Sequence, residues 1–170
     1  SINSFMPTKN YTKYLSIILL LFTFTLAFGQ NNTKFKVVLD AGHGGEDPGA
    51  VKNGIKEKDI VLDVVLKIGK ILESNKNIEI IYTRKTDVFI GLKERANIAN
   101  KAKANLFVSV HCNGVKSTAA RGTETFVMGM SRTDTNLDIA KKENGVIFLE
   151  KNYNEKYKGF DPNNPETLLG

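Results

Sequence analysis

The stretch LDAGHGGEDPGA, Leu39–Ala50, decides how the first half of this chain folds. The apolar run KFKVVLD (Lys34–Asp40) leads into it and predicts a short buried strand. After Asp40 come four glycines, one proline, two acids and one of the two histidines in the chain. Phosphate-binding loops are also rich in glycine, but they need no histidine, whereas a metal site uses one. The stretch therefore predicts a strand that runs into a ligand-binding loop.

Helices and further strands alternate along the chain on the C-terminal side of this loop. Apolar residues at helical spacing predict a helix that begins near Glu57 and ends around ESNKN, and a second helix is predicted at Gly91–Ala104. Strands are predicted at Ile78–Arg84, Asn105–His111 and Gly122–Gly129. The strand Asn105–His111 is apolar on both faces, so we expect it to be buried on both. A last helix is predicted at Thr135–Tyr153, weakened by Asn144-Gly145.

This alternation predicts the fold class. Strands separated by helices of this length form βαβ units with right-handed crossovers. The expected architecture is α/β, a mainly parallel or mixed sheet flanked by helices, in a single domain that follows an N-terminal leader.

That leader, residues 1–29, is typical of a secretory signal peptide. Lys9 and Lys13 precede an uncharged apolar run of 14 residues, Leu15–Phe28, whereas a membrane-spanning helix needs about 20. Small residues at Ala27 and Gly29 predict cleavage near Gly29, which leaves a domain of residues 30–170 with no stable membrane anchor. Residues 1–5 precede a plausible start and have no assigned origin. An uncleaved anchor is the alternative. The expected location is the cell envelope, periplasmic or extracellular.

Charge and cysteine content argue against a nucleic-acid-binding protein and against a disulfide-bonded one. The net charge is +6, but two of the lysines belong to the leader and the remaining excess is spread along the chain. No basic run or interleaving of basic and aromatic residues predicts nucleic-acid binding. Cys112 is the only cysteine, so this exported chain contains no internal disulfide.

Three side chains are candidate metal ligands. His43 follows the first strand and His111 ends the third, so both lie at the carboxyl edge of the expected sheet, where open α/β sheets bind ligands. Glu57 opens the helix after the loop. Two imidazoles and one carboxylate with an open fourth position form the ligand set of a catalytic zinc site.

Each candidate also has a structural alternative. Either histidine could be a hydrogen-bonded structural residue, and Glu57 could serve the helix dipole, worth about 0.3–1 kcal/mol. Their separations of 14 and 54 residues differ from the compact H-E-x-x-H motif. The loop could instead hold a phosphate, although it lacks the P-loop lysine.

Several motifs in order strengthen the zinc interpretation. The runs VVLDAGHGGEDPGAVKNGIKEKDIVLDVV, IYTRKTDVFIGLKERANIAN and ANLFVSVHCN resemble the zinc-dependent N-acetylmuramoyl-L-alanine amidases of bacterial cell-wall turnover. The resemblance covers Phe35 to about Met128. It implies an α/β fold, one zinc ion held by His43, Glu57 and His111, and hydrolysis of the amide between N-acetylmuramic acid and the L-alanine of the peptidoglycan stem peptide.

The resemblance also implies a general base. In the family this is a glutamate near the C-terminal end of the domain, and no segment around DPNNPETLLG resembles its motif. We therefore expect the catalytic glutamate to lie beyond Gly170, and the chain as given to hold zinc yet to be a poor amidase. If it is fully active, the candidates within it are Glu124, Glu143, Glu150 and Glu166.

Other family positions are expected to be structural or regulatory. Arg84, Asp87 and Arg95 are expected to form ion pairs that hold the loop, and Cys112 to be a small buried side chain rather than a fourth ligand. Residues Thr135–Pro165 look like an insertion, and in regulated members a helix inserted here covers the zinc site. Glu143 or Glu150 could thus be an inhibitory or substrate-side acid, with a plain surface helix as the alternative.

Three function classes follow. The first is the zinc amidase acting on peptidoglycan, with an activator protein as a candidate partner. The second is a non-catalytic peptidoglycan-binding or regulatory module, and the third is an exported α/β protein that binds a phosphorylated ligand.

Overall fold

The computed structural model describes residues 14–15, 33–113, 119–127, 134–161 and 164. Its contacts divide the chain into two units, Ser1–Lys34 and Phe35–Gly170. Apart from Tyr14 and Leu15, the proposed signal peptide lies outside the described residues. Within the described ranges, none of the helices combines the length and the apolar character needed to cross a membrane.

A three-stranded parallel sheet forms the centre of the second unit. Strand β1 (Phe35–Ala41) lies between β4 (Ile78–Tyr82) and β5 (Leu106–Val110) and pairs in parallel with both. In register, Val37 lies opposite Ile80 on one side and Leu106 on the other. The prediction of a mainly parallel α/β sheet is confirmed.

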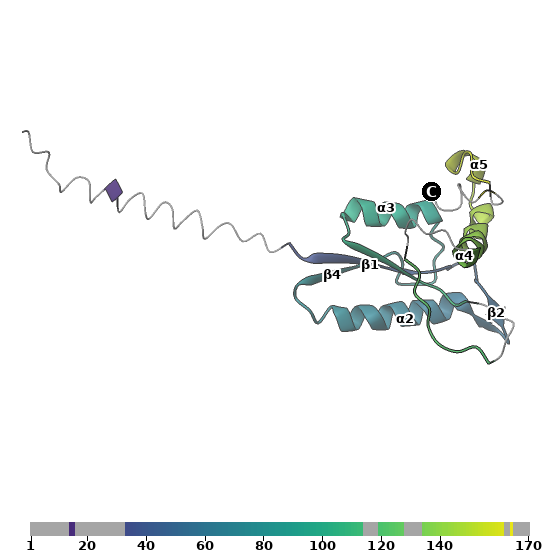
Figure 1. The fold of residues 1–170 in the computed structure, drawn as a ribbon, viewed down its shortest axis with the longest axis horizontal. Helices are drawn as coiled ribbons and strands as arrows, with labels where there is room; N and C mark the ends of the chain where they lie inside the picture. Colours follow the sequence, from purple (N-terminus) through teal and green to yellow (C-terminus); the bar gives the residue numbers. More distant parts are fainter. Residues whose placement is uncertain (1–13, 16–32, 114–118, 128–133, 162–163, 165–170) are drawn as a thin grey trace, which may run out of the picture. The chain divides into compact units, whose positions relative to one another are not determined.

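Two helices cover opposite faces of this sheet (Figure 1). Helix α2 (Glu57–Leu72) connects β1 to β4. Helix α3 (Leu92–Ala102) connects β4 to β5, which lies on the other side of β1 in the sheet. Because both crossovers are expected to be right-handed and they run in opposite directions along the sheet, they place their helices on opposite faces. The expected ranges of both helices are confirmed to within two residues.

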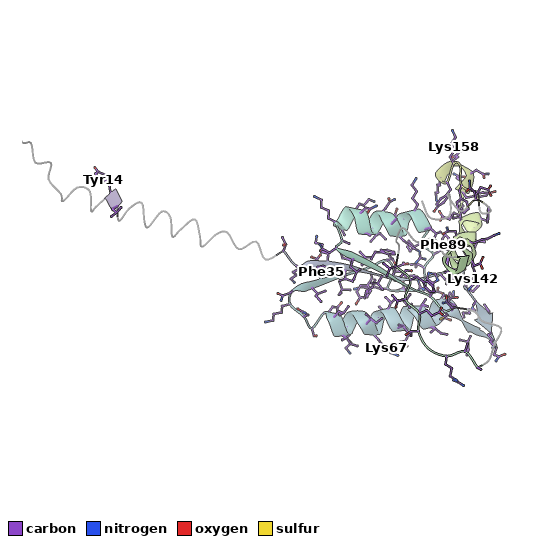
Figure 2. All side chains as sticks on the ribbon, viewed as in Figure 1. Tyr14, Phe35, Lys67, Phe89, Lys142 and Lys158 are labelled. Atoms are coloured by element: carbon purple, nitrogen blue, oxygen red, sulfur yellow. The ribbon has the colours of Figure 1, made fainter. Side chains whose placement is uncertain are left out.

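The hydrophobic core lies between β1 and α2. Val37, Leu39 and Ala41 alternate along β1 and pack against Val61 and Val65 of α2, all at most 4% exposed. Figure 2 shows the opposite side of the same helix, where Lys67 points away from the sheet. The alternating side chains of β1 and the helically spaced side chains of α2 thus form one apolar layer, as expected for a half-buried helix.

A short hairpin folds the glycine loop back toward the sheet edge. Strands β2 (Val51–Lys52) and β3 (Ile55–Lys56) pair antiparallel around Asn53 and Gly54, whose φ angles are +54° and +79°. Positive φ at both central residues is the requirement of a type I′ turn, which favours Asn-Gly. The hairpin ends at Lys56, so α2 begins beside the loop.

Two strand expectations differ from the structure. Within the described residues 119–127 no strand forms, so the strand expected at Gly122–Gly129 is wrong as far as its described part extends; Phe126 and Val127 are 44% and 79% exposed. Strand β5 is also not buried on both faces, because it pairs only with β1 in the described part of the sheet and leaves Leu106 and Phe107 more than 40% exposed. An apolar composition gives strand propensity, but a covering element decides burial.

The long helix expected at Thr135–Tyr153 is divided into three pieces. Helix α4 (Asp134–Asn144) ends at the Asn144-Gly145 step, a 3₁₀ segment η1 (Gly145–Leu149) follows, and α5 (Tyr153–Lys156) is a single turn. Asn152 adopts φ of +60° between the last two pieces, which ends the helical path there.

Candidate metal centre

The structure brings the three predicted ligands together at the carboxyl edge of the sheet. His43 lies in the loop after β1, Glu57 is the first residue of α2, and His111 follows β5. His43 Nε2 lies 3.1 Å from Glu57 Oε1 and 3.2 Å from His111 Nδ1, and His111 Nδ1 lies 3.4 Å from the same Glu57 oxygen. Two ring nitrogens and one carboxylate oxygen thus face one another from three elements.

A fourth side chain reaches the same point from α4. Glu143 Oε2 lies 2.9 Å from His111 Nδ1 and 3.5 Å from His43 Nε2, and the Glu143 side chain is 17% exposed. Ligand atoms of His43, His111 and Glu143 all lie within 4.8 Å of one another, close enough to hold one metal ion. Of the two acids that the sequence suggested for this position, the structure brings Glu143 to the histidines.

Glu150 lies elsewhere, which corrects the expectation that it faces the metal site. Its side chain is 3% exposed and accepts hydrogen bonds from the backbone N–H of Leu92 at 2.9 Å and the hydroxyl of Tyr157 at 2.7 Å. Leu92 is the first residue of α3, whose first N–H groups have no partner within the helix. Glu150 therefore caps α3, because the break after α4 sends the chain back to that helix terminus.

Two glycines make room for the imidazole rings. A Cβ atom on Gly42 would lie 2.4 Å from His111 Cε1, and one on Gly49 would lie 2.6 Å from His43 Cδ2. Gly49 also has φ of +65°, which L side chains rarely adopt. The rings therefore pack directly on the backbone at these two glycines.

Glu57 is ionised in this environment. Its side chain is 1% exposed, and its carboxylate accepts hydrogen bonds from the backbone N–H of Ala50 at 3.0 Å and of Cys112 at 2.6 Å in addition to its histidine contacts. Burial raises the pKa of Glu57, but the hydrogen bonds from the two imidazoles and the two amides outweigh it and hold the pKa well below its usual range.

The carboxylates hold protons on both imidazoles in the metal-free protein. Burial lowers the pKa of His43, but hydrogen bonds to Asp47 and Glu57 outweigh it and raise the pKa to about 9. Burial likewise lowers the pKa of His111, and hydrogen bonds to Glu143 and Glu57 raise it to about 9. A cation bound between the rings would take the place of these protons.

Asp47 belongs to the site although the sequence analysis did not single it out. Its carboxylate Oδ2 lies 2.8 Å from His43 Nδ1, on the ring edge opposite to the nitrogen that faces Glu57. An acid four residues after a histidine in a glycine-rich loop was the available signal. The spacing alone does not show that Asp47 contacts the ring, because the contact depends on how the loop folds.

Arg95 and Arg84 hold the loop by its carbonyl groups. Arg95 forms an ion pair with Asp40 at 2.7 Å and donates to the carbonyls of Ala41 and His43, both at 2.7 Å. Arg84 donates to the carbonyls of Ala41 and Gly42 at 2.9 and 2.8 Å and to two further carbonyls. Arg84 thus differs from the expected ion pair, because among the described residues its hydrogen bonds go to backbone oxygens.

Asp87 ties the same loop to α2. Its carboxylate accepts the backbone N–H of Gly45 at 2.7 Å and pairs with Lys58 Nζ at 2.6 Å, and Lys58 also donates to the carbonyl of Gly45. Arg84, Asp87 and Arg95 therefore contact the backbone that carries His43 rather than the cluster of donor atoms itself.

The remaining candidates lie apart from the donor cluster. Cys112 is partly buried against the apolar core, where burial raises the pKa of its thiol, and only its backbone N–H reaches Glu57. Glu124 is exposed and accepts a hydrogen bond from the amide of Asn113 at 3.0 Å. Glu166 lies outside the described residues.

Comparison with known proteins places this chain in a family. The sequence model of the family described as N-acetylmuramoyl-L-alanine amidase matches residues 37–168. The endolysin of Bacillus phage SPP1 is 54% identical over 90 residues, which cover 53% of this chain and 32% of that protein. The amidase AmiA of Escherichia coli K12 is 44% identical over 93 residues, covering 54% of this chain and 32% of AmiA.

A solved structure agrees with these sequence matches. The catalytic domain of CwlV, an N-acetylmuramoyl-L-alanine amidase from Bacillus (Paenibacillus) polymyxa var. colistinus, is 39% identical with a TM-score of 0.53. The superposition covers 62% of this chain and 59% of that domain. The chain spans about a third of the length of the two curated relatives named above.

Proposed function

Because this chain belongs to the N-acetylmuramoyl-L-alanine amidase family, we propose that it hydrolyses the amide between N-acetylmuramic acid and the L-alanine of the peptidoglycan stem peptide. The observation that carries the proposal is the convergence of His43, Glu57 and His111, from three separate elements, with donor atoms 3.1–3.4 Å apart. The peptidoglycan substrate suits an exported protein of the cell envelope, which is the location proposed for this chain.

The donor set suits one zinc ion. Imidazole nitrogens and a carboxylate oxygen are typical zinc ligands, and catalytic sites use three of them. His43 Nε2, His111 Nδ1 and Glu57 Oε1 would hold the ion, and the glycines under the two rings leave the space open. When bound, zinc lowers the pKa of a coordinated water toward about 7 and polarises the scissile carbonyl.

Glu143 has a different role in this proposal. Its carboxylate lies 2.9 Å from His111 Nδ1 and 3.5 Å from His43 Nε2, so it would compete for the fourth position that a catalytic zinc leaves to water or substrate. We assign it as an inhibitory acid carried by α4, which leaves the site before substrate binds. An activator protein that moves α4 is the partner this arrangement would use. A substrate-side or proton-transferring role for Glu143 is the alternative.

The glycine loop itself argues against a phosphate site. A phosphate-binding loop directs free backbone N–H groups at its ligand. Here the N–H of Gly44 donates to the carbonyl of Asp47, that of Gly45 to Asp87, and that of Gly49 to the carboxylate of Asp47. The loop amides are therefore engaged within the protein.

Metal content and hydrolysis of purified peptidoglycan test the proposal together. The chain should bind one zinc, and His111→Ala should lose most of it, because removal of one ligand leaves an incomplete site. Lys67→Ala is the matched control, since Lys67 is exposed and pairs only with Asp63 among the residues the structure describes. Unchanged zinc content in both His43→Ala and His111→Ala would refute the ligand assignment.

A further inference from the structure

Asp47 contacts the proposed ligand His43 through the nitrogen that does not face the site. The Asp47 carboxylate oxygen Oδ2 lies 2.8 Å from His43 Nδ1, while His43 Nε2 faces Glu57 and His111. Asp47 is 7% exposed, so this contact is shielded from water. The protein thus holds the ring through Nδ1 and leaves Nε2 directed at the other proposed ligands.

The backbone of the loop places the Asp47 carboxylate. Gly44 and Asp47 exchange two backbone hydrogen bonds, of 2.9 and 3.1 Å, which close a tight turn between His43 and Asp47. The second carboxylate oxygen, Oδ1, accepts the N–H of Gly49 at 3.0 Å. Each oxygen of Asp47 thus has its own donor, and the side chain has one orientation that serves both.

His43 itself is held in an uncommon conformation. Its φ of +59° lies in the left-handed region, which costs a non-glycine residue about 1–3 kcal/mol and persists only where the surroundings enforce it. Arg95 donates to the His43 carbonyl at 2.7 Å and Asp47 holds the ring. The strained backbone conformation thus occurs at His43, the residue whose ring has to point into the donor cluster.

We propose that Asp47 is a positioning residue that fixes the proton of neutral His43 on Nδ1 and so keeps the lone pair of Nε2 directed into the metal site. An ionised carboxylate only accepts hydrogen bonds, so the ring nitrogen that faces it carries hydrogen. An ion between Nε2 and Glu57 would take the place of the proton on Nε2, and the proton that faces Asp47 would remain on Nδ1. Carboxylate partners of this kind orient metal-binding histidines and increase their basicity. The inference rests on the metal role proposed for the site.

Asparagine at position 47 should reverse this preference. The N–H of Gly49 needs an acceptor, which directs the amide oxygen of Asn toward it and the amide NH₂ group toward His43 Nδ1. A ring nitrogen facing a donor must offer its lone pair, so the proton moves to Nε2 and blocks the ligand position. Asp47→Ala favours neither tautomer, because it leaves no hydrogen-bonding side chain opposite His43 Nδ1.

The order of the two variants separates positioning from simple packing. If Asp47 only packs or closes the turn, Asp47→Asn should be the milder change, because it keeps the size of the side chain and the bond to Gly49. If Asp47 selects the tautomer, Asp47→Asn should be at least as harmful as Asp47→Ala. Glu46→Gln is the matched control, since Glu46 is the neighbouring acid of the same loop and is exposed.

The experiment uses the chain with zinc alone as the probe and needs no substrate. Zinc affinity is measured by competition with a chelator. The tautomer of neutral His43 is read from ¹⁵N–¹H long-range correlations of the metal-free protein at a pH above the His43 pKa of about 9, where the ring has lost one proton. We expect Nδ1–H in the wild type and in Glu46→Gln, and Nε2–H in Asp47→Asn with zinc affinity lower by roughly 10–100-fold, the usual effect of losing such a partner.

The outcomes distinguish this inference from the proposed function. Wild-type affinity and tautomer in Asp47→Asn, or an affinity that only Asp47→Ala lowers, would overturn the role of Asp47. Absence of zinc binding in the wild type would overturn the proposed function, while the tautomer spectra of the metal-free protein would still test Asp47. If Asp47→Asn does not fold, Asp47→Ala with mixed tautomers supports the role, and Asp47→Ala with Nδ1–H alone contradicts it.

Discussion

Gly42 shows at the scale of one residue how closely the backbone supports the donor cluster. The Gly42→Ala change would bring a Cβ atom to 2.4 Å from the His111 ring, a distance that forces the ring to move. We expect a clear loss of zinc affinity, at least tenfold, because ligand atoms displaced by a few tenths of an ångström no longer share one ion. Chelator competition measures it.

Gly145→Ala is the control for this change. Gly145 likewise has no positive φ, and a Cβ atom there would meet nothing within 4 Å. The two substitutions therefore share the same chemistry and differ in the neighbouring ring. Equal zinc affinity in the two variants would show that His111 does not depend on the space above Gly42.

The raised pKa values of the histidines give the metal-free protein a pH-dependent stability. His43 and His111 each have a pKa of about 9 in the folded state against 6.5 for the free side chain, since carboxylate hydrogen bonds outweigh burial. The folded state therefore binds these protons more tightly than the unfolded state. The resulting stability is complete below pH 6.5 and is lost as pH rises to about 9.

Chemical denaturation with a chelator present measures this dependence. The free energy of unfolding should fall between pH 6.5 and 9, and His111→Ala should show a smaller slope because one of the two titrating rings is gone. A stability that is constant over this range would mean that the rings do not form ion pairs with Glu57 and Glu143 in solution.

At the scale of elements, helix α4 carries the acid that is proposed to block the centre. Glu143 of α4 contacts both histidines, and a hydrogen bond to a charged group contributes about 1.5–3 kcal/mol. The Glu143→Ala change removes this hydrogen bond. It should therefore raise the fraction of molecules with an uncovered site by about tenfold and raise the rate of peptidoglycan hydrolysis. Release of soluble muropeptides from purified peptidoglycan measures the rate.

Asp138→Asn is the control on the same helix, because Asp138 is an exposed acid of α4. It should leave the rate unchanged. If Glu143→Ala lowers the rate while Asp138→Asn does not, Glu143 acts as a proton-transferring acid rather than as an inhibitory one. The same pair of variants thus decides between the two roles.

At the scale of the whole molecule, the centre joins elements that are distant in sequence. The loop after β1, the start of α2 and the end of β5 meet only in the folded chain, so a metal bound there stabilises the folded state over the unfolded one. At free zinc 100 times the dissociation constant, the gain is about 2.7 kcal/mol.

Thermal unfolding with and without zinc checks this linkage. The midpoint should rise with zinc concentration in the wild type and should not respond in His111→Ala. Lys67→Ala, on the outer face of α2 (Figure 2), should respond like the wild type. A midpoint independent of zinc in the wild type would mean that the three elements are not joined through a metal.

Local pattern determined much of the fold and of the site. Apolar alternation in β1 and helical spacing in α2 predicted both elements, because side-chain periodicity follows from backbone geometry. The same positions placed His43 and His111 at one sheet edge, since the carboxyl ends of parallel strands share that edge. The family motifs then supplied Glu57, and the structure brought all three together.

Only the tertiary structure decided which acids surround these histidines and what covers each strand. Glu143 and Glu150 lie seven residues apart and looked equivalent in sequence, yet the break at Asn144 directs one to the histidines and the other to the start of α3. Asp47 became a ring partner through a turn with a left-handed His43. Propensity is local, whereas these contacts depend on how loops bend and which elements meet, so the sequence pattern alone left them undetermined.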